Sequence, residues 1–282
     1  MKSTLQDRIL ACQDHFTESE RRLADVTLAC GFKLASYSAT EIAQMADVSK
    51  ATVARFFRGL GYANFNDVRT QARDDADRGS PLYELAGVKL PLAPADSLEH
   101  HLANDLKNLA QTLQALDAET VEQTVLALSK ARRVFIVGFR NGRVLAQYAW
   151  ALLTQVRSEV VLVPGAGLNL AEDLADLGTA DVMLVMDFRR RVALLRPIIE
   201  HANNVGARII VLTDPSATEL PARAELVLRC VNHGSTIFDS YIAAMSLLNH
   251  LCSNLVLRLG VRARNRLKHI ESLHDHYGDL HR

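Results

Sequence analysis

Apolar positions recur at two different spacings along the chain, and the spacing changes near residue 133. Over about the first 77 residues they follow a helical period, as at Ile42, Met45 and Ala46. Residues 17–20 (TESE) and 38–41 (SATE) fit the capping box, in which a hydroxyl and a carboxylate satisfy exposed backbone donors at the start of a helix. The pattern predicts a bundle of short helices in this part of the chain.

After residue 133, short apolar runs alternate with segments of helical period. Runs that are apolar on both faces and separated by helices are typical of a parallel sheet covered on both sides. We therefore expect a doubly wound α/β domain with a five-stranded parallel sheet, followed by two helices over 235–259 and 262–280. The predicted strands are 134–138, 160–163, 182–186, 208–213 and 225–230.

The expected organisation has four parts: an all-α domain over 1–77, a linker with its leading helix over 78–117, a three-layer α/β domain over 118–259 and a C-terminal helix over 260–282. Within the linker we expect a short helix around 83–86 and a long helix over 97–116. Ligands of doubly wound sheets bind at the carboxyl ends of the strands. The loops of interest are therefore 138–143, 164–169, 187–192 and 213–218.

Composition excludes several classes of protein. Of the 282 residues, 49% are hydrophobic, which excludes a disordered chain. The four cysteines are scattered and show no CxxC or other metal-ligand spacing, so we expect no metal and no cofactor. No apolar run approaches the ~18 residues that span a bilayer, and the first residues lack a signal-peptide core. The expectation is a cytoplasmic protein without a membrane partner.

Net charge is zero, but the charges are unevenly distributed. Residues 49–73 contain five basic side chains against one acidic side chain, which gives a local excess of four positive charges. Such a basic face on a neutral protein suits contacts with phosphates. The basic residues are Lys50, Arg55, Arg58, Arg69 and Arg73, and the acidic residue is Asp67.

Residues 38–62 (SATEIAQMADVSKATVARFFRGLGY) have the pattern of two short helices joined by a tight turn. The first helix covers 39–45, and Ser49 is a good N-cap for a second helix over 49–60. Lys50, Thr52 and Arg55 share the exposed side of this second helix, while Val53, Phe56 and Leu60 face the core. A helix of this size and chemistry fits the DNA major groove. The alternative is a pair of amphipathic helices from an ordinary bundle.

The motif Ser-x-x-Thr-Val-x-Arg-Phe, followed by Leu-Gly-Tyr and Asn-Phe, resembles the N-terminal domain of the RpiR (MurR/RpiR) family of bacterial regulators. The resemblance runs from about residue 5 to residue 73. Asp47 stands at the turn position that the family often fills with glycine, and aspartate tolerates a left-handed backbone better than most residues. The resemblance implies DNA contacts at Ser49, Lys50, Thr52, Arg55, Tyr62 and Asn64.

Residues 120–259 resemble the sugar isomerase (SIS) domain that the same family carries, which usually senses phosphorylated sugars through serine and threonine hydroxyls in two loops. Where the family usually has Gly-x-Gly-x-Ser, this chain has Gly138-Phe139-Arg140-Asn141-Gly142. Where it usually has Ser-x-Ser-Gly-x-Thr, this chain has Asp187-Phe188-Arg189-Arg190-Arg191-Val192. Nearly every phosphate-binding hydroxyl is missing from both loops.

Arginines replace these hydroxyls, and three adjacent arginines before a helix repel each other and the helix dipole unless an anion compensates them. We therefore predict a pocket for a small anionic metabolite, a sugar phosphate or a carboxylate, held by bidentate arginine. Of the three, Arg191 is expected to point outward. The predicted effector-binding residues are Gly138, Arg140, Asn141, Gly142, Asp187, Arg189, Arg190 and Ser240.

Three alternatives to an effector pocket remain open. The arginines could pair with Asp173, Asp187 or Asp239, or serve a dimer interface, which would make the domain a ligand-free scaffold. A sugar-phosphate isomerase would need a general base, for which Glu172, His201 and His233 are the candidates. We expect no enzyme but a regulator that binds double-stranded operator DNA, and we expect the operator to be an inverted repeat because a dimer carries two recognition helices. A homodimer or tetramer would form through the SIS-domain helices and residues 267–280.

Overall fold

The computed structural model describes residues 5–12, 16–30, 34, 37–77, 98–167, 169–235 and 238–280. The chain divides into two units, Met1–Leu90 and Pro91–Arg282. The short helix predicted around 83–86 lies outside the described residues.

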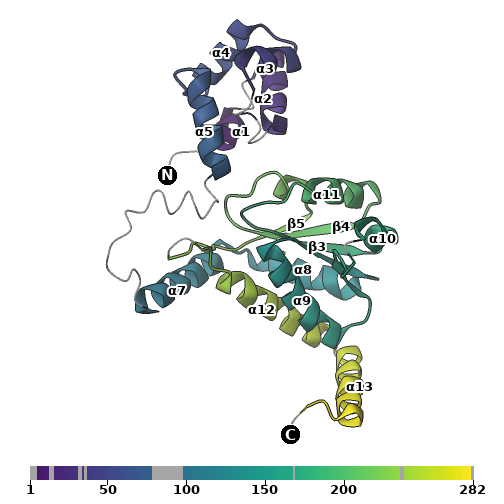
Figure 1. The fold of residues 1–282 in the computed structure, drawn as a ribbon. Coiled ribbons are helices and arrows are strands. Elements are labelled where there is room, and N and C mark those ends of the chain that lie inside the picture. Colours follow the sequence, from purple (N-terminus) through teal and green to yellow (C-terminus); the bar gives the residue numbers. More distant parts are fainter. Residues whose placement is uncertain are drawn as a thin grey trace. The chain divides into compact units, whose positions relative to one another are not determined.

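The first unit is helical, as predicted. Its helices are α1 (Leu5–Cys12), α2 (Glu18–Cys30), α3 (Ala39–Met45), α4 (Lys50–Gly59) and α5 (Phe65–Asp77) (Figure 1). Both capping boxes form, with Glu20 accepting from the Thr17 amide and Glu41 from the Ser38 amide. Phe57 lies at the centre of the core, where its ring contacts those of Phe56, Tyr62 and Phe65.

Fewer side chains of α3 are buried than its helical period of apolar residues predicts. Ile42 and Ala46 are buried, but Met45 is 49% exposed. Met45 is the last residue of this two-turn helix, so its side chain passes the edge of the core.

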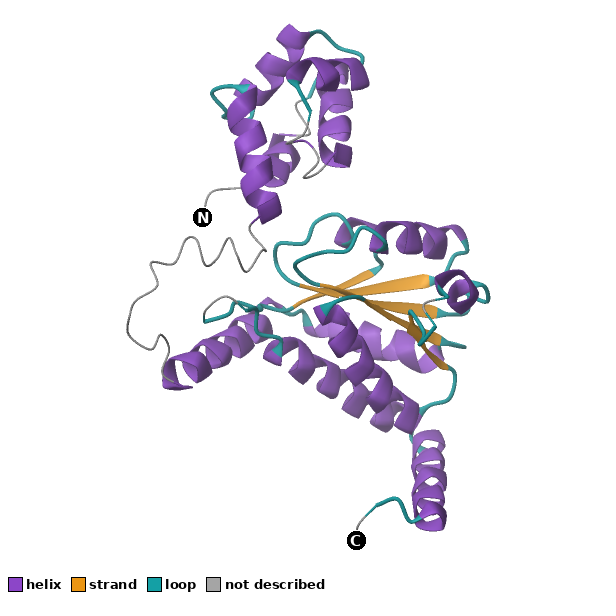
Figure 2. Cartoon of the chain, viewed as in Figure 1, coloured by secondary structure: helices purple, strands orange, loops and turns teal. Residues whose placement is uncertain are grey.

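The second unit begins with α7 (Leu98–Ala115) and α8 (Ala118–Lys130), and its five strands form an all-parallel sheet in the order β2-β1-β3-β4-β5. Helices lie on both faces of this sheet (Figure 2). The remaining elements are β1 (Val134–Gly138), α9 (Asn141–Val156), β2 (Val160–Val163), α10 (Leu170–Leu174), β3 (Val182–Asp187), α11 (Leu195–Asn204), β4 (Arg208–Thr213), a 3₁₀ turn (Pro221–Arg223), β5 (Leu226–Arg229), α12 (Ile242–Leu259) and α13 (Val261–Tyr277).

Alternate strand residues enter two separate cores, which explains why the strands are apolar on both faces. Val134 and Ile136 pack with α8, α9 and α12 on one side. Phe135 and Val137 pack with α10 and α11 on the other side. The strand order reverses between β1 and β3, so their carboxyl ends flank the crevice in which such folds bind ligands.

Helix α12 differs from its prediction in two respects. It begins at Ile242 rather than at residue 235, because residues 231–235 are held in a non-helical path by hydrogen bonds to α7. It also has the length and mean hydropathy (18 residues, 1.3) of a segment that could cross a membrane, which the expectation of no such run overlooked. Seven of its side chains, including Leu248 and Leu255, are buried against the sheet and its covering helices.

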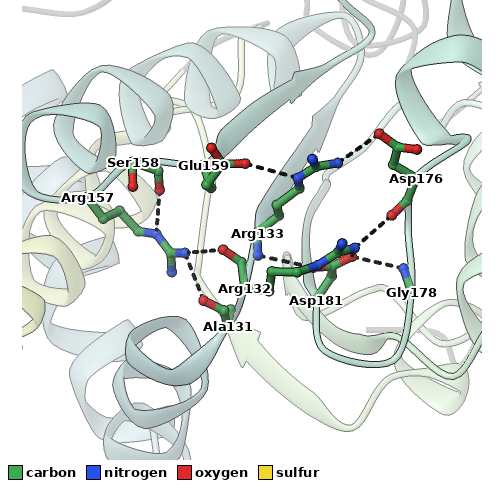
Figure 3. Close-up of polar contacts among 9 residues, drawn as sticks. All are labelled: Ala131, Arg132, Arg133, Arg157, Ser158, Glu159, Asp176, Gly178 and Asp181. Atoms are coloured by element: carbon green, nitrogen blue, oxygen red, sulfur yellow. Dashed lines mark hydrogen bonds and ion pairs between the residues drawn. The ribbon is translucent and has the colours of Figure 1, made fainter.

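The amino-terminal edge of the sheet is closed by arginines that are fully engaged (Figure 3). Arg132 donates to both oxygens of buried Asp181, at 2.9 and 2.7 Å. Arg133 pairs with Glu159 and Asp176. Arg157 donates to the carbonyls of Ala131 and Arg132, and burial lowers the pKa of its guanidinium. These arginines stabilise the amino-terminal ends of the strands.

Candidate DNA-binding surface and effector site

Helix α4 and its N-cap carry most of the polar side chains that were predicted from the sequence to contact DNA. Ser49 is its N-cap, accepting from the Thr52 amide at 3.1 Å, and the two hydroxyls are 2.8 Å apart. Lys50 and Arg55 are exposed on the same helix. The opposite side is buried, as predicted, through Val53, Phe56 and Leu60.

Tyr62 and Asn64, like Ser49 and Thr52, have hydrogen-bond partners within the protein. The hydroxyl of Tyr62 donates to Gln71 Oε1 at 2.8 Å, and the Arg8 guanidinium lies over its ring at 4.6 Å. Because Tyr62 is buried, we assign it to packing rather than to DNA contact. Asn64 is exposed, and its Oδ1 accepts from the Asp67 amide at 3.1 Å at the start of α5.

The turn before α4 is held by an arginine that the sequence analysis did not identify. Asp47 has a φ of 51°, so it adopts the left-handed conformation expected of it. Arg22 of α2 donates to the carbonyls of Ala46 and Asp47, at 3.1 and 3.3 Å. Arg8 donates to the Leu60 carbonyl at the other end of α4. No local pattern reveals these clamps, because their partners are 24 to 52 residues away.

The two glycines of the first SIS loop allow α9 to approach the sheet closely. A Cβ at Gly138 would lie 2.3 Å from the Gly142 carbonyl oxygen, and a Cβ at Gly142 would lie 2.9 Å from the Met186 oxygen. Both residues are buried. They therefore serve the packing of α9 on β1 and β3, whatever ligand is bound.

The predicted arginine loops meet at one cavity of about 450 Å³. Arg140 contributes from the β1–α9 loop, and Arg190 from the segment after β3, and both are exposed. Arg140 has φ 51° and ψ −127°, a backbone conformation that L residues rarely adopt. The cavity is lined by Phe139, Arg140, Arg190, Arg191 and Val192.

The expectation that Arg191 points outward is wrong. Its Nε donates to Asp187 Oδ2 at 3.2 Å and its Nη2 to Asp214 Oδ2 at 2.8 Å. Both carboxylates are buried. Burial raises the pKa of Asp187 to about 6, whereas Arg191 and the Ser216 bonds keep the pKa of Asp214 below its usual value despite its burial. Arg191 turns inward because two buried carboxylates need a cation.

The other predicted residues face away from the cavity or toward neighbouring loops. Arg189 pairs with Asp239 at 3.2 Å. Asn141 Nδ2 donates to the Tyr241 hydroxyl at 3.4 Å. Ser240 donates to Asp105 of α7 at 2.5 Å, so its hydroxyl serves a helix contact. Of the eight residues predicted to bind the effector, the structure brings Arg140 and Arg190 together at the cavity.

The helix-turn-helix unit and the doubly wound α/β unit together define a regulator that joins a DNA-binding fold to a sugar isomerase fold. Family models support both halves: "Helix-turn-helix domain, rpiR family" matches residues 3–78, and "SIS domain" matches residues 127–253. The chain belongs to the RpiR family of helix-turn-helix transcriptional regulators.

Relatives in sequence include proteins that are much longer than this chain and proteins of similar length. The Bifunctional protein glk of Burkholderia pseudomallei is 28% identical over 269 residues, which are 95% of this chain and 41% of that protein. This chain thus spans about two fifths of the length of that relative. An uncharacterized HTH-type transcriptional regulator of Providencia stuartii is 24% identical over 230 residues, which are 80% of each chain.

Solved structures confirm the predicted fold. The sugar isomerase domain of an RpiR transcription factor from Sphaerobacter thermophilus matches 62% of this chain and 97% of its own, with a TM-score of 0.58 and 24% identity. The Vibrio vulnificus NanR protein complexed with ManNAc-6P matches 96% of this chain and 98% of its own, with a TM-score of 0.58 and 15% identity.

Proposed function

We propose that this protein is a cytoplasmic transcriptional regulator that binds operator DNA through α4 and senses a small anionic metabolite at the cavity between Arg140 and Arg190. The observation that carries the effector site is the different engagement of the arginines around the crevice. Arg189 and Arg191 are paired with buried or half-buried carboxylates. Within the described residues, no ion pair joins Arg140 or Arg190 to a carboxylate.

Two arginines at one cavity favour a ligand with a doubly charged or forked anionic group. A guanidinium donates two parallel hydrogen bonds to phosphate or carboxylate, and two guanidinium groups can hold one such group from two sides. NanR was solved with a sugar phosphate, which supports a phosphate ester as the first candidate for this chain. A sugar acid or a dicarboxylate has the same anionic chemistry.

Calorimetric titration of the full chain with inorganic phosphate, ManNAc-6P and a dicarboxylate such as succinate tests this site. We expect one of them to bind the wild-type protein and to bind the Arg140→Gln and Arg190→Gln variants at least tenfold more weakly. Arg196→Gln is the matched control, because Arg196 lies on α11 in an exposed ion pair with Glu200. Equal affinity of all four proteins for the ligand would refute the site.

The DNA-binding surface comprises Ser49, Lys50, Thr52, Arg55 and Asn64, with Arg22 holding the turn. Ser49 and Lys50 lie at the amino-terminal end of α4, where backbone donors and the helix dipole favour a phosphate. If an effector weakens DNA binding tenfold, DNA must weaken effector binding tenfold as well, a coupling of about 1.4 kcal/mol. Titrating the effector with and without operator DNA checks this reciprocity.

A second copy of the chain is the proposed partner for binding two half-sites of an inverted repeat. A groove of about 940 Å³ runs between α7, α8 and α12, and Leu113 and Leu257 at its rim are 77% and 79% exposed. Leucines this exposed on one groove favour a homodimer or a tetramer. Light scattering should show that Leu113→Glu lowers the mass to that of a monomer.

The second candidate is a DNA-binding dimer whose SIS domain binds no ligand. It is favoured by the pairing of Arg189 with Asp239 and of Arg191 with Asp187 and Asp214, which neutralises part of the crevice. Unchanged heats across the whole anion panel, together with normal operator binding, would support this scaffold. An isomerase would instead turn over a sugar phosphate, which an assay of the same panel detects.

A further inference from the structure

Residues 239–241 contact two loops on one side and α7 on the other. The two loops are the β1–α9 loop and the segment after β3, which contribute Arg140 and Arg190 to the cavity. Asp239 accepts from Arg189 Nη2 at 3.2 Å. Tyr241 accepts from Asn141, and its ring meets that of Phe188 at 5.3 Å in an edge-on arrangement. Ser240, between them, donates to Asp105 of α7 at 2.5 Å. Neighbouring side chains of this segment thus contact different elements, the two loops on one side and α7 on the other.

Helix α7 is attached to this region by polar contacts. Its Asn104 and Asn108 amides donate to the His233 carbonyl at 2.6 and 2.7 Å, and its Thr112 hydroxyl accepts from the Val231 amide at 2.8 Å. His101 lies 3.1 Å from the Ser235 hydroxyl. The contacting positions share one face of the helix at intervals of three or four residues.

The apolar side chains of the first half of α7 are not used for this attachment. Leu98, Leu102 and Leu106 are all more than half exposed. The buried residues of the helix are Asn108 and Thr112, both polar. A hydrogen bond contributes only about 1 kcal/mol net, so the first half of α7, whose leucines are exposed, is held by weak polar contacts, whereas Leu109 of the second half packs against the core. In sequence, α7 directly follows residues 78–97, which join it to the DNA-binding unit.

We propose that residues 239–241 couple the cavity between Arg140 and Arg190 to α7, so that binding of an anion in the cavity changes how firmly α7 is held. An anion bound by Arg140 and Arg190 shifts the segment after β3 that also carries Arg189, and this shift separates Arg189 from Asp239. Residues 239–241 are then released, and the Ser240–Asp105 bond weakens. The first half of α7 then loosens next to the segment that leads to the DNA-binding unit. This inference rests on the proposed effector role of the crevice, and it assigns Ser240 to coupling instead of ligand binding.

Hydrogen exchange of the full chain without ligand tests the coupling directly. Arg189→Gln should speed exchange of the amides of residues 101–108 at least threefold, because it removes the bond from Arg189 to Asp239. Ser240→Ala should have the same effect, and the double variant should add nothing further, because both changes break one connection. Arg196→Gln removes a comparable ion pair on α11 and should leave α7 unchanged.

Two results would overturn the coupling: wild-type exchange of α7 in Arg189→Gln, or additive effects in the double variant. If exchange in Arg189→Gln rises equally in α8 and α11, the variant is generally destabilised. Asp239→Asn, which keeps the shape of the side chain, then decides by the same criterion. Adding inorganic phosphate to the wild type should reproduce the loosening. Loosening by the variants without an effect of phosphate would retain the coupling and refute phosphate as the ligand.

Discussion

Replacing Arg140 by glycine should stabilise the second unit while weakening its binding of anions. Arg140 has φ 51° and ψ −127°, at the position where the family usually has glycine. Holding a non-glycine residue in such a region costs about 1–3 kcal/mol. Glycine removes this strain but adds roughly 0.4–1 kcal/mol of unfolded-state entropy. The net expectation for Arg140→Gly is a gain of about 1 kcal/mol.

The chain contains a single tryptophan, which makes the measurement specific to this unit. Trp150 lies on α9, the helix that begins beside Arg140. Urea unfolding followed by Trp150 fluorescence therefore reports the α/β unit even if the helical unit unfolds separately. At an m value near 2 kcal/mol/M, the expected gain moves the midpoint upward by about 0.5 M.

Arg190→Gly is the matched control, because it makes the same chemical change at the same cavity. Arg190 has no positive φ, so glycine brings no relief of strain and should cost about 0.5–1 kcal/mol. Both variants should lose affinity for the anion that binds the wild type. A midpoint for Arg140→Gly at or below that of Arg190→Gly would refute the assignment of strain to Arg140.

Four further predictions concern the buried charges and the helix-turn-helix. Arg191→Gln should lower the free energy of unfolding by about 3 kcal/mol in the same urea assay, because it leaves two buried carboxylates without their cation. The Arg191 side chain is 31% exposed, and a decrease below 1 kcal/mol would contradict this. The pKa of Asp187 rises on folding from 3.8 to about 6, so its favourable contribution is complete below pH ~3.8 and is lost as pH rises through about 6. As pH rises from 4 to 7.5, the free energy of unfolding of Asp187→Asn should therefore increase by up to ~3 kcal/mol relative to that of the wild type. If the two proteins show parallel curves of unfolding free energy against pH, this prediction is wrong. Arg55→Ala should weaken operator binding by roughly 1–3 kcal/mol in a fixed-salt anisotropy titration, and unchanged affinity would remove Arg55 from the interface. Asp47→Gly should raise the free energy of unfolding of the helical unit by about 0.5–1 kcal/mol, measured as a higher melting temperature, because φ is 51° there and glycine keeps the carbonyl that Arg22 contacts; a lower melting temperature would refute strain at this position.

Periodicity predicted the fold closely, because it records which side chains avoid water. All five strands occur at the predicted apolar runs, and α3 has the predicted bounds. The beginning of α12 was misplaced by seven residues because polar bonds to α7, more than 100 residues away, decide the path of 231–235. A local pattern contains no trace of such a partner.

The sequence predicted which residue types surround the candidate site but not which way their side chains point. The sequence identified arginines where hydroxyls usually stand, and the structure brings Arg140 and Arg190 to one cavity. It did not identify which arginine turns inward, since Arg191 is held by Asp214 from a different strand end. Ser240 was assigned to the ligand because its position lies near the pocket, whereas its side chain reaches α7.

The two glycines and Arg140 of the first loop meet different requirements. The glycines are needed for packing of the fold, whereas Arg140 is explained by the proposed ligand binding. Gly138 and Gly142 have no space for a Cβ against neighbouring backbone, so any chain with this packing must keep them. Arg140 stands where packing would favour glycine and bears a strained backbone instead. Strain of this kind persists where a side chain is needed for function. A ligand-free scaffold gains nothing from Arg140, whereas an anion sensor does, and the stability and affinity of Arg140→Gly together decide between them.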